Sequence, residues 1–210
     1  GVSSQQLQDL LTPYLVAAES QFPAHMATLK GMSVGAMVPV LELFAINAFE
    51  ELEPMLQAPE GEILFLQRKE GYLAPPKAPP ERCSSFAVTG PGVTILAHNE
   101  HWLAGDLGNV AVVIDVPDDR PTRIASPTIV CCLPAVGMNS LGGAQGIGSL
   151  TASDDGVGVP RVLVSRNALE ATDRDDAISR AGHPARAGGY GHVYAFANGD
   201  TFVVETTGKE

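Results

Sequence analysis

The sequence predicts an α+β fold in which antiparallel sheets are packed between helices. Apolar residues follow helical spacing through the first 56 residues, and short apolar runs separated by glycine and proline turns follow residue 83. Two further helical segments and a hairpin close the chain. This order of helices, antiparallel strands, helices and strands is typical of layered α+β proteins. The 210 residues suffice for one large domain or two small ones.

Three helices are expected before residue 57. The first has Ser3 or Ser4 as its N-cap and an apolar face of Leu7, Leu10 and Leu11. The second covers 23–36, because proline fits the first helical turn. The third covers 38–56, and its apolar face has helical spacing through Leu41, Phe44, Ala45, Ala48 and Leu52. The acidic residues of this helix are expected to face water, namely Glu42, Glu50 and Glu53.

A short strand at 62–69 and a proline-rich linker at 73–82 are expected next. Within that linker "LAPPKAPP" favours an extended polyproline conformation, which cannot join a central sheet. The sequence thus divides into a helical segment, 1–82, and a β-rich segment, 83–210.

The β-rich segment is expected to open with a hairpin, 84–88 and 93–99, around Gly90-Pro91-Gly92. Strands are expected at 109–116, at 123–133 with a break at Pro127, and at 142–150. The glycines of this last strand suit close approach by another backbone or a ligand. Helices are expected at 160–171 and 173–181, the second with Thr172 and Asp175 as a capping box. A closing hairpin is expected at 190–197 and 201–206.

Composition excludes several classes of function. The net charge of −11 argues against nucleic-acid binding and against an anionic membrane surface. No apolar run is long enough for a membrane helix, and no signal peptide opens the chain, so a cytoplasmic enzyme is expected. The glycines of 142–150 do not open a helix as a dinucleotide loop would, and no cofactor is expected.

The cysteine and histidine residues do not form a recognisable metal motif. Cys131 and Cys132 lie in an apolar run and are expected in the core, as is His192. Along a strand, His98 and Glu100 share one face while His101 points away, so no metal site is predicted from these three.

Cys83 lies between the proline-rich linker and the first strand of the hairpin. It is either a structural thiol or a nucleophile that becomes a new N-terminus. If the bond between Arg82 and Cys83 were cut, the freed α-amine, with a pKa of about 7.7–8.0, would lie beside its own thiol. One residue would then supply both nucleophile and general base.

Seven segments, in order, resemble the isopenicillin-N acyltransferase-like family of N-terminal nucleophile hydrolases. These segments are "TLKGMSVGA", "LELFAINAFEEL", "CSSFAV", "GVTILAHNEHW", "GMNSLGGAQGIGSL", "GVPRVLVSRNALEATDRDDAI" and "VVETT". The resemblance implies a four-layer αββα sandwich, self-cleavage before Cys83 and a thioester acyl-enzyme. It implies Cys83 as nucleophile, with Asn99 and Thr207 near the active site.

The same resemblance implies a small acylated amine or thioester as substrate, with acyl-coenzyme A among the acyl donors, and the cleaved N-terminal fragment as a partner. Hydrolysis and acyl transfer both stay open, as does a homo-oligomer. Arg82 stands where the family has glycine, and His101 stands where it has aspartate; His101 is still expected in the site.

The family continues with a His-Thr-Asn-His-like motif whose asparagine lines the oxyanion hole, and the 210 residues do not contain it. The sequence is therefore a fragment, or another chain or segment completes the site, or the acylase chemistry is impaired. The alternative function is a catalytically silent relative that keeps the fold to bind a small molecule or a partner.

Overall fold

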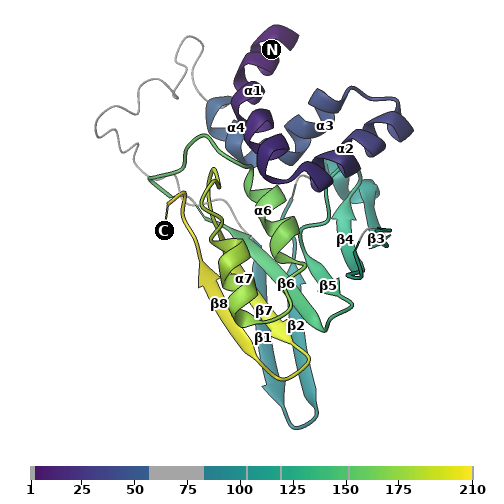
Figure 1. Ribbon diagram of the computed structural model, residues 1–210, viewed down its shortest axis with the longest axis vertical. Coiled ribbons are helices and arrows are strands. Elements are labelled where there is room, and N and C mark those ends of the chain that lie inside the picture. Colours follow the sequence, from purple (N-terminus) through teal and green to yellow (C-terminus); the bar gives the residue numbers. More distant parts are fainter. Residues whose placement is uncertain (1–2, 57–82, 103, 119, 151, 210) are drawn as a thin grey trace.

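The computed structural model describes residues 3–56, 83–102, 104–118, 120–150 and 152–209 (Figure 1). The predicted strand 62–69, the linker 73–82 and Arg82 lie outside these residues. The described chain is a mixed α+β protein with a two-stranded and a six-stranded antiparallel sheet. None of its described helices is both long and apolar enough to cross a membrane.

The first two helices form where the sequence predicts them. Helix α1 spans Ser4–Gln21, and Ser3 caps it in a capping box with Gln6. Helix α2 spans Pro23–Ala36 and has its proline in the first turn, where the missing N–H costs no hydrogen bond.

The single helix predicted over 38–56 is wrong, because the chain forms two helices there. Helix α3 spans Val40–Asn47 and α4 spans Phe49–Leu56, with Ala48 between them at φ −114° and ψ 20°. The buried side-chain amide of Asn47 donates to the carbonyl of Cys131, and its oxygen accepts from the N–H of Leu133. These bonds hold the end of α3 against a turn that is distant in sequence. The apolar spacing of 38–56 alone does not reveal this contact.

The six-stranded sheet has the order β3-β4-β5-β6-β7-β8, and every pair is antiparallel. Its strands are Val110–Asp115, Ile124–Ile129, Gly137–Asn139, Gly143–Ser149, Tyr190–Phe196 and Thr201–Glu205. The predicted strands at 109–116 and 142–150 and the closing hairpin are confirmed. The short strand β5 and the 3-10 helix η1, Ala104–Asn109, were not predicted.

The predicted strand 123–133 is too long. Strand β4 ends at Ile129, and the following turn has Cys131 at φ +76°, a left-handed conformation that ends an extended run. Pro127 does not break the strand. It pairs with Val112 of β3, on the side of β4 where β5 no longer continues, because β5 pairs with Ile124 and Ala125. Both thiols are half-buried in this turn, and Cys131 packs against the core, so the prediction that both lie in the core holds only in part.

Helices α6, Arg161–Ala168, and α7, Arg174–Ala181, cover one face of strands β7 and β8. Small residues of the helices meet the aromatic rings of Tyr194 and Phe196 there. The predicted capping box of Thr172 and Asp175 is wrong: the N-cap of α7 is Asp173, whose side chain accepts from the N–H of Asp176.

The hairpin of β1, Ser84–Gly90, and β2, Val93–Asn99, packs on the opposite face of the sheet, over β6, β7 and β8. Gly146 permits this contact, because a Cβ there would lie 2.7 Å from Ser85 Oγ. A Cβ at Gly148 would have no neighbour closer than 3.9 Å, the carbonyl oxygen of Cys83. The close approach predicted for this glycine-rich strand is found at Gly146, where side chains of the hairpin, and not its backbone, come near.

One hydrophobic core joins the N-terminal helices to the rest of the protein. Leu11 of α1 and Phe44 of α3 lie in the same buried cluster as Leu133 and Leu163. Residues on both sides of Cys83 therefore bury one another. His192, predicted in the core, is buried on strand β7.

Candidate functional site

The hairpin register places Cys83 beside Glu100. Ser84 pairs with Asn99 across the hairpin, so the residue before β1 lies opposite the residue after β2. The thiol of Cys83 donates to Oε1 of Glu100 at 3.0 Å. The backbone N–H of His101 approaches Sγ from the other side at 3.4 Å. The thiol is half-buried and has a carboxylate neighbour.

His98 extends this cluster. Side chains two residues apart on a strand share a face, so His98 and Glu100 both point toward the thiol side of the hairpin. Nε2 of His98 lies 3.1 Å from Oε2 of Glu100, and its Nδ1 lies 2.8 Å from Ser85 Oγ. The cluster is therefore a chain of hydrogen bonds from Cys83 through Glu100 and His98 to Ser85.

The two acidic groups in contact have opposite pKa shifts. Burial raises the pKa of Cys83 to about 12, and the hydrogen bond to Glu100 adds to the rise because it holds the neutral thiol. Burial acts to raise the pKa of Glu100 as well, but hydrogen bonds from His98 and Cys83 outweigh it and lower that pKa. At neutral pH the intact chain holds a protonated thiol against a carboxylate.

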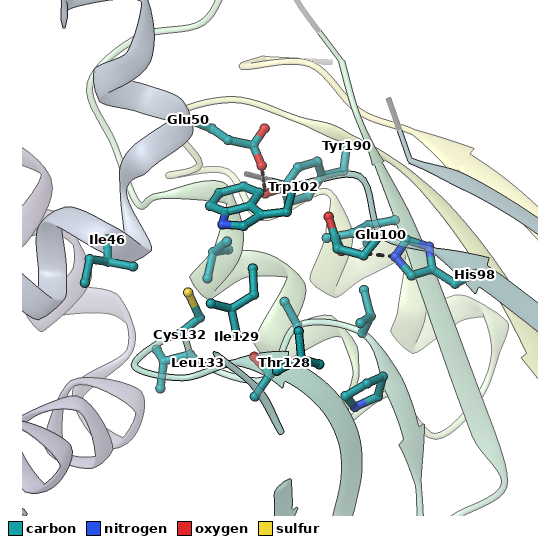
Figure 2. Close-up of a pocket in the computed structure, with 16 residues that line it drawn as sticks. Ile46, Glu50, His98, Glu100, Trp102, Thr128, Ile129, Cys132, Leu133 and Tyr190 are labelled. Carbon is teal, nitrogen blue, oxygen red and sulfur yellow. Dashed lines mark hydrogen bonds and ion pairs between the residues drawn. The ribbon is translucent and has the colours of Figure 1, made fainter. Parts of the chain in front are cut away.

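A cavity of about 230 Å³ adjoins this cluster (Figure 2). His98 and Glu100 form its polar end, and Trp102 and Cys132 contribute to its wall. Its remaining lining is mostly apolar and comes from helices α3, α4 and α6, strands β3, β4, β6 and β7 and the segment after β4, including Ile46, Val110, Ile129, Leu133, Ile147 and Val162. None of the described residues that line it is a lysine or arginine.

The prediction that Glu50 faces water is wrong, because Glu50 lines this cavity. Its Oε1 accepts a 2.6 Å hydrogen bond from the hydroxyl of Tyr190, as Figure 2 shows. Burial raises the pKa of Glu50 despite the nearby guanidinium of Arg161. Arg161 is itself buried and is held by Glu51 at 2.9 Å and Asp155 at 3.2 Å, which joins α4 to the start of α6.

The structure brings together only some of the residues predicted for the site. Asn99 follows His98 and points to the other face, where its amide donates to Ser84 Oγ at 3.3 Å. His101 contacts the thiol through its backbone N–H, and its side chain is exposed. Thr207 donates to Asp154 at 2.7 Å in the loop after β8. Cys83 is the predicted site residue around which the cluster forms.

Sequence reasoning missed Glu100 as the partner of Cys83. The signal was present, because a hairpin that pairs 84 with 99 sets 83 against 100. The alternation along β2 alone relates His98 and Glu100 to His101, whereas the partner of Glu100 lies on the other strand of the hairpin. Cys83, His98 and Glu100 each offer one donor atom, and these three atoms lie within 4.8 Å of one another.

No protein-family model matches this chain, and a comparison with curated proteins found no match.

Proposed function

We propose that this protein is a self-processing N-terminal-cysteine amide hydrolase or acyltransferase, with Cys83 as its nucleophile. One observation carries the proposal: a cysteine at the start of a rigid hairpin has its thiol fixed by Glu100, next to a largely apolar cavity. The order of helix layer, six-stranded sheet and hairpin is compatible with the four-layer αββα sandwich that the sequence resemblance implies.

Self-cleavage would begin with attack of Sγ on the carbonyl carbon of Arg82. Glu100 accepts the thiol proton as the S–C bond forms, and the proton passes to the departing nitrogen of Cys83 as the C–N bond breaks. Water then hydrolyses the thioester and frees the Arg82 carboxylate. Because the thiol pKa is about 12, the intact chain has little thiolate, so this step needs the carboxylate at 3.0 Å.

After the cut, the α-amine of Cys83 replaces Glu100 as the base. An amine with a pKa of about 7.7–8.0 is matched to proton transfer near neutral pH, unlike a carboxylate with a lowered pKa. Attack on a substrate carbonyl gives a thioester, which water or an acceptor amine resolves. The N–H of His101, 3.4 Å from Sγ, keeps the sulfur in place during both steps.

The cavity favours an uncharged, apolar acyl group. Its lining is largely apolar, and its carboxylates, Glu50 and Glu100, repel an anionic group. The N-terminal segment contributes Ile46 and Glu50 to the lining and shares the core with α6. The 82-residue fragment would therefore stay bound after cleavage and complete the substrate site.

Intact mass under denaturing conditions tests the proposal. The wild-type chain is expected to yield fragments ending at Arg82 and beginning at Cys83, while Cys83→Ala stays whole. A Cys132→Ser variant, which alters a second half-buried thiol, is expected to cleave. An uncut wild-type chain that also fails to be acylated by a cysteine-directed acyl probe would overturn the proposal.

A second candidate is a silent relative that binds an apolar small molecule in the cavity. The raised pKa of Cys83 favours it, since a thiol held at about 12 is a weak nucleophile. Binding of a fluorescent apolar probe that persists unchanged in Cys83→Ala, in a chain that is never cut, would support this candidate over the enzyme.

A further inference from the structure

The group of Cys83, His98 and Glu100 combines three kinds of metal ligand. A thiol, an imidazole and a carboxylate converge so that their donor atoms lie within 4.8 Å of one another. Sγ and Oε1 are 3.0 Å apart, and Nε2 and Oε2 are 3.1 Å apart. His98 lies within the paired register of one hairpin, and Cys83 and Glu100 directly flank its last pair, Ser84 and Asn99. The hairpin thus places the three residues side by side.

Small side-chain rotations would bring the three donor atoms to the separations of a tetrahedral zinc site. Zn–S bonds of about 2.3 Å and Zn–N or Zn–O bonds of about 2.0–2.2 Å place neighbouring ligand atoms about 3.3–3.6 Å apart. The observed 3.0 Å joins Sγ to Oε1 and the 3.1 Å joins Nε2 to Oε2, so the exposed Glu100 carboxylate must rotate to bring one oxygen to both, and Sγ and the imidazole, within 4.8 Å, must close on the same ion. A soft sulfur ligand excludes magnesium and calcium, which take oxygen ligands, and favours zinc or cobalt.

The surrounding groups also suit a bound metal. When a metal replaces the hydrogen bond from Nε2 to Glu100, the imidazole takes the tautomer in which Nδ1 donates to Ser85 Oγ, 2.8 Å away, and Nε2 then carries the lone pair that a metal requires. The N–H of His101 at 3.4 Å from Sγ stabilises a metal-bound thiolate. Two anions, the thiolate and the Glu100 carboxylate, would neutralise the charge of a divalent ion in a half-buried site. The thiol proton is released to solvent as the metal binds.

We propose that Cys83, His98 and Glu100 form a binding site for a divalent zinc-like metal ion that holds the thiol unreactive. Three protein ligands leave one tetrahedral position for water. In a chain cut before Cys83, the α-amine would occupy that position, since amine and thiolate of one cysteine close a five-membered chelate ring. Metal binding stands on the geometry alone, whereas its effect on cleavage and acyl transfer rests on the proposed function.

The test is a titration of the metal-free, full-length chain with Zn²⁺, in competition with a chromogenic chelator, and with Co²⁺ followed by absorption. The wild type is expected to bind one equivalent, with a thiolate-to-cobalt charge-transfer band and tetrahedral d–d bands. Cys83→Ser and His98→Gln are expected to lose this spectrum. Ser85→Ala, which removes the support of His98, is expected to weaken affinity about 10- to 100-fold.

Cys132→Ser is the matched control, because it removes another half-buried thiol but leaves the three ligands in place. It is expected to keep the full spectrum and affinity. Circular dichroism of each variant shows whether the fold is retained. Binding that survives in Cys83→Ser or His98→Gln, or a wild type that binds no Co²⁺ with sulfur coordination, would overturn the metal site.

Self-cleavage provides an independent readout. If the chain binds one Zn²⁺ but, free of metal, is neither cut before Cys83 nor acylated, the metal site stands and the proposed enzyme is wrong. If the chain is cut and acylated but has no affinity for zinc, the proposed enzyme stands and the metal site is wrong. If both proposals hold, excess Zn²⁺ stops acylation of Cys83, and a chelator restores it.

Discussion

The hydroxyl of Tyr190 on strand β7 donates to Glu50 on helix α4 at 2.6 Å, across 140 positions of the sequence. This bond ties the N-terminal helices to the sheet at the wall of the cavity. The same bond gives the Glu50 carboxylate an uncharged hydrogen-bond donor. The guanidinium of Arg161 lies 3.8 Å from the other oxygen of this carboxylate. The cavity is thus bounded by parts of the chain from both sides of Cys83.

Replacing Tyr190 with Phe should destabilise the protein by about 1–3 kcal/mol, because Glu50 keeps its burial and loses one of its hydrogen-bond donors. Urea denaturation of the two proteins measures the difference. Tyr194→Phe is the matched control, since this equally buried hydroxyl makes only a 3.5 Å contact with His192. Equal losses in the two variants would show that the Glu50 bond contributes nothing particular.

Replacing Gly146 with Ala should displace the hairpin from the sheet. The new Cβ would lie 2.7 Å from Ser85 Oγ and 3.2 Å from Cβ of His98, so the Cys83 cluster must shift. We expect lower stability, slower cleavage and weaker Co²⁺ binding. Gly148→Ala, whose Cβ would be 3.9 Å from its nearest neighbour, should leave all three unchanged. A harmless Gly146→Ala would mean that the hairpin does not pack on β6 as described.

Replacing Glu100 with Gln should make Cys83 easier to ionise but slower to cleave. Burial, the main cause of the raised thiol pKa, stays, while the carboxylate that favours the neutral thiol is removed. The midpoint of iodoacetamide modification should therefore move from near pH 12 toward lower pH. Cleavage should slow, since the proton acceptor is gone.

Peptide mass spectrometry separates Cys83 from Cys132 in this experiment. Burial likewise raises the pKa of Cys132 to about 12, and Glu100 is only a minor contributor there. Cys132 therefore serves as an internal reference whose midpoint should move less. A Cys83 midpoint that stays in place, or cleavage that speeds up in Glu100→Gln, would contradict the assigned role of the carboxylate.

Stability should fall as pH drops below about 6.5, because two buried histidines resist protonation. Burial lowers the pKa of His25 and of His192 from 6.5 to about 3. Between these values the unfolded chain binds protons that the folded chain does not, so acid favours unfolding by up to about 1.4 kcal/mol per pH unit for each residue. Above about pH 6.5 this effect is absent.

Chemical denaturation at a series of pH values measures the slope. His192→Gln and His25→Gln should each flatten the profile below pH 6.5, even where they lower stability at neutral pH. A slope that is unchanged in both variants would show that other groups govern acid unfolding.

Much of the fold could be predicted because its signals are local. The cap at Ser3, the turn around Gly92 at φ +74° and the glycine-rich strand β6 follow from what single residues permit in the backbone. The alternation along β2 also placed His98 and Glu100 on one face, which the structure confirms through their 3.1 Å contact.

The remaining features depend on contacts between distant residues. The helix break at Ala48 follows from the bonds of Asn47 to the Cys131–Leu133 turn, and Glu50 is drawn inward by Tyr190. Neither partner is recognisable from the apolar spacing of 38–56. The contact between Cys83 and Glu100 is an intermediate case. The hairpin itself follows from local signals, but predicting the contact also requires the register in which its two strands pair.

The antiparallel register of the first hairpin makes the chemistry of Cys83 sensitive to a remote turn. Gly90 pairs with Val93 at the tip, and every pairing back to Ser84 and Asn99 follows from that closure. A slip of one residue would turn His98 and Glu100 outward and bring Asn99 to the thiol side. The number of residues in the turn therefore determines which base and which metal ligands lie next to Cys83. A change in loop length could switch the site without replacing any side chain that contacts the sulfur.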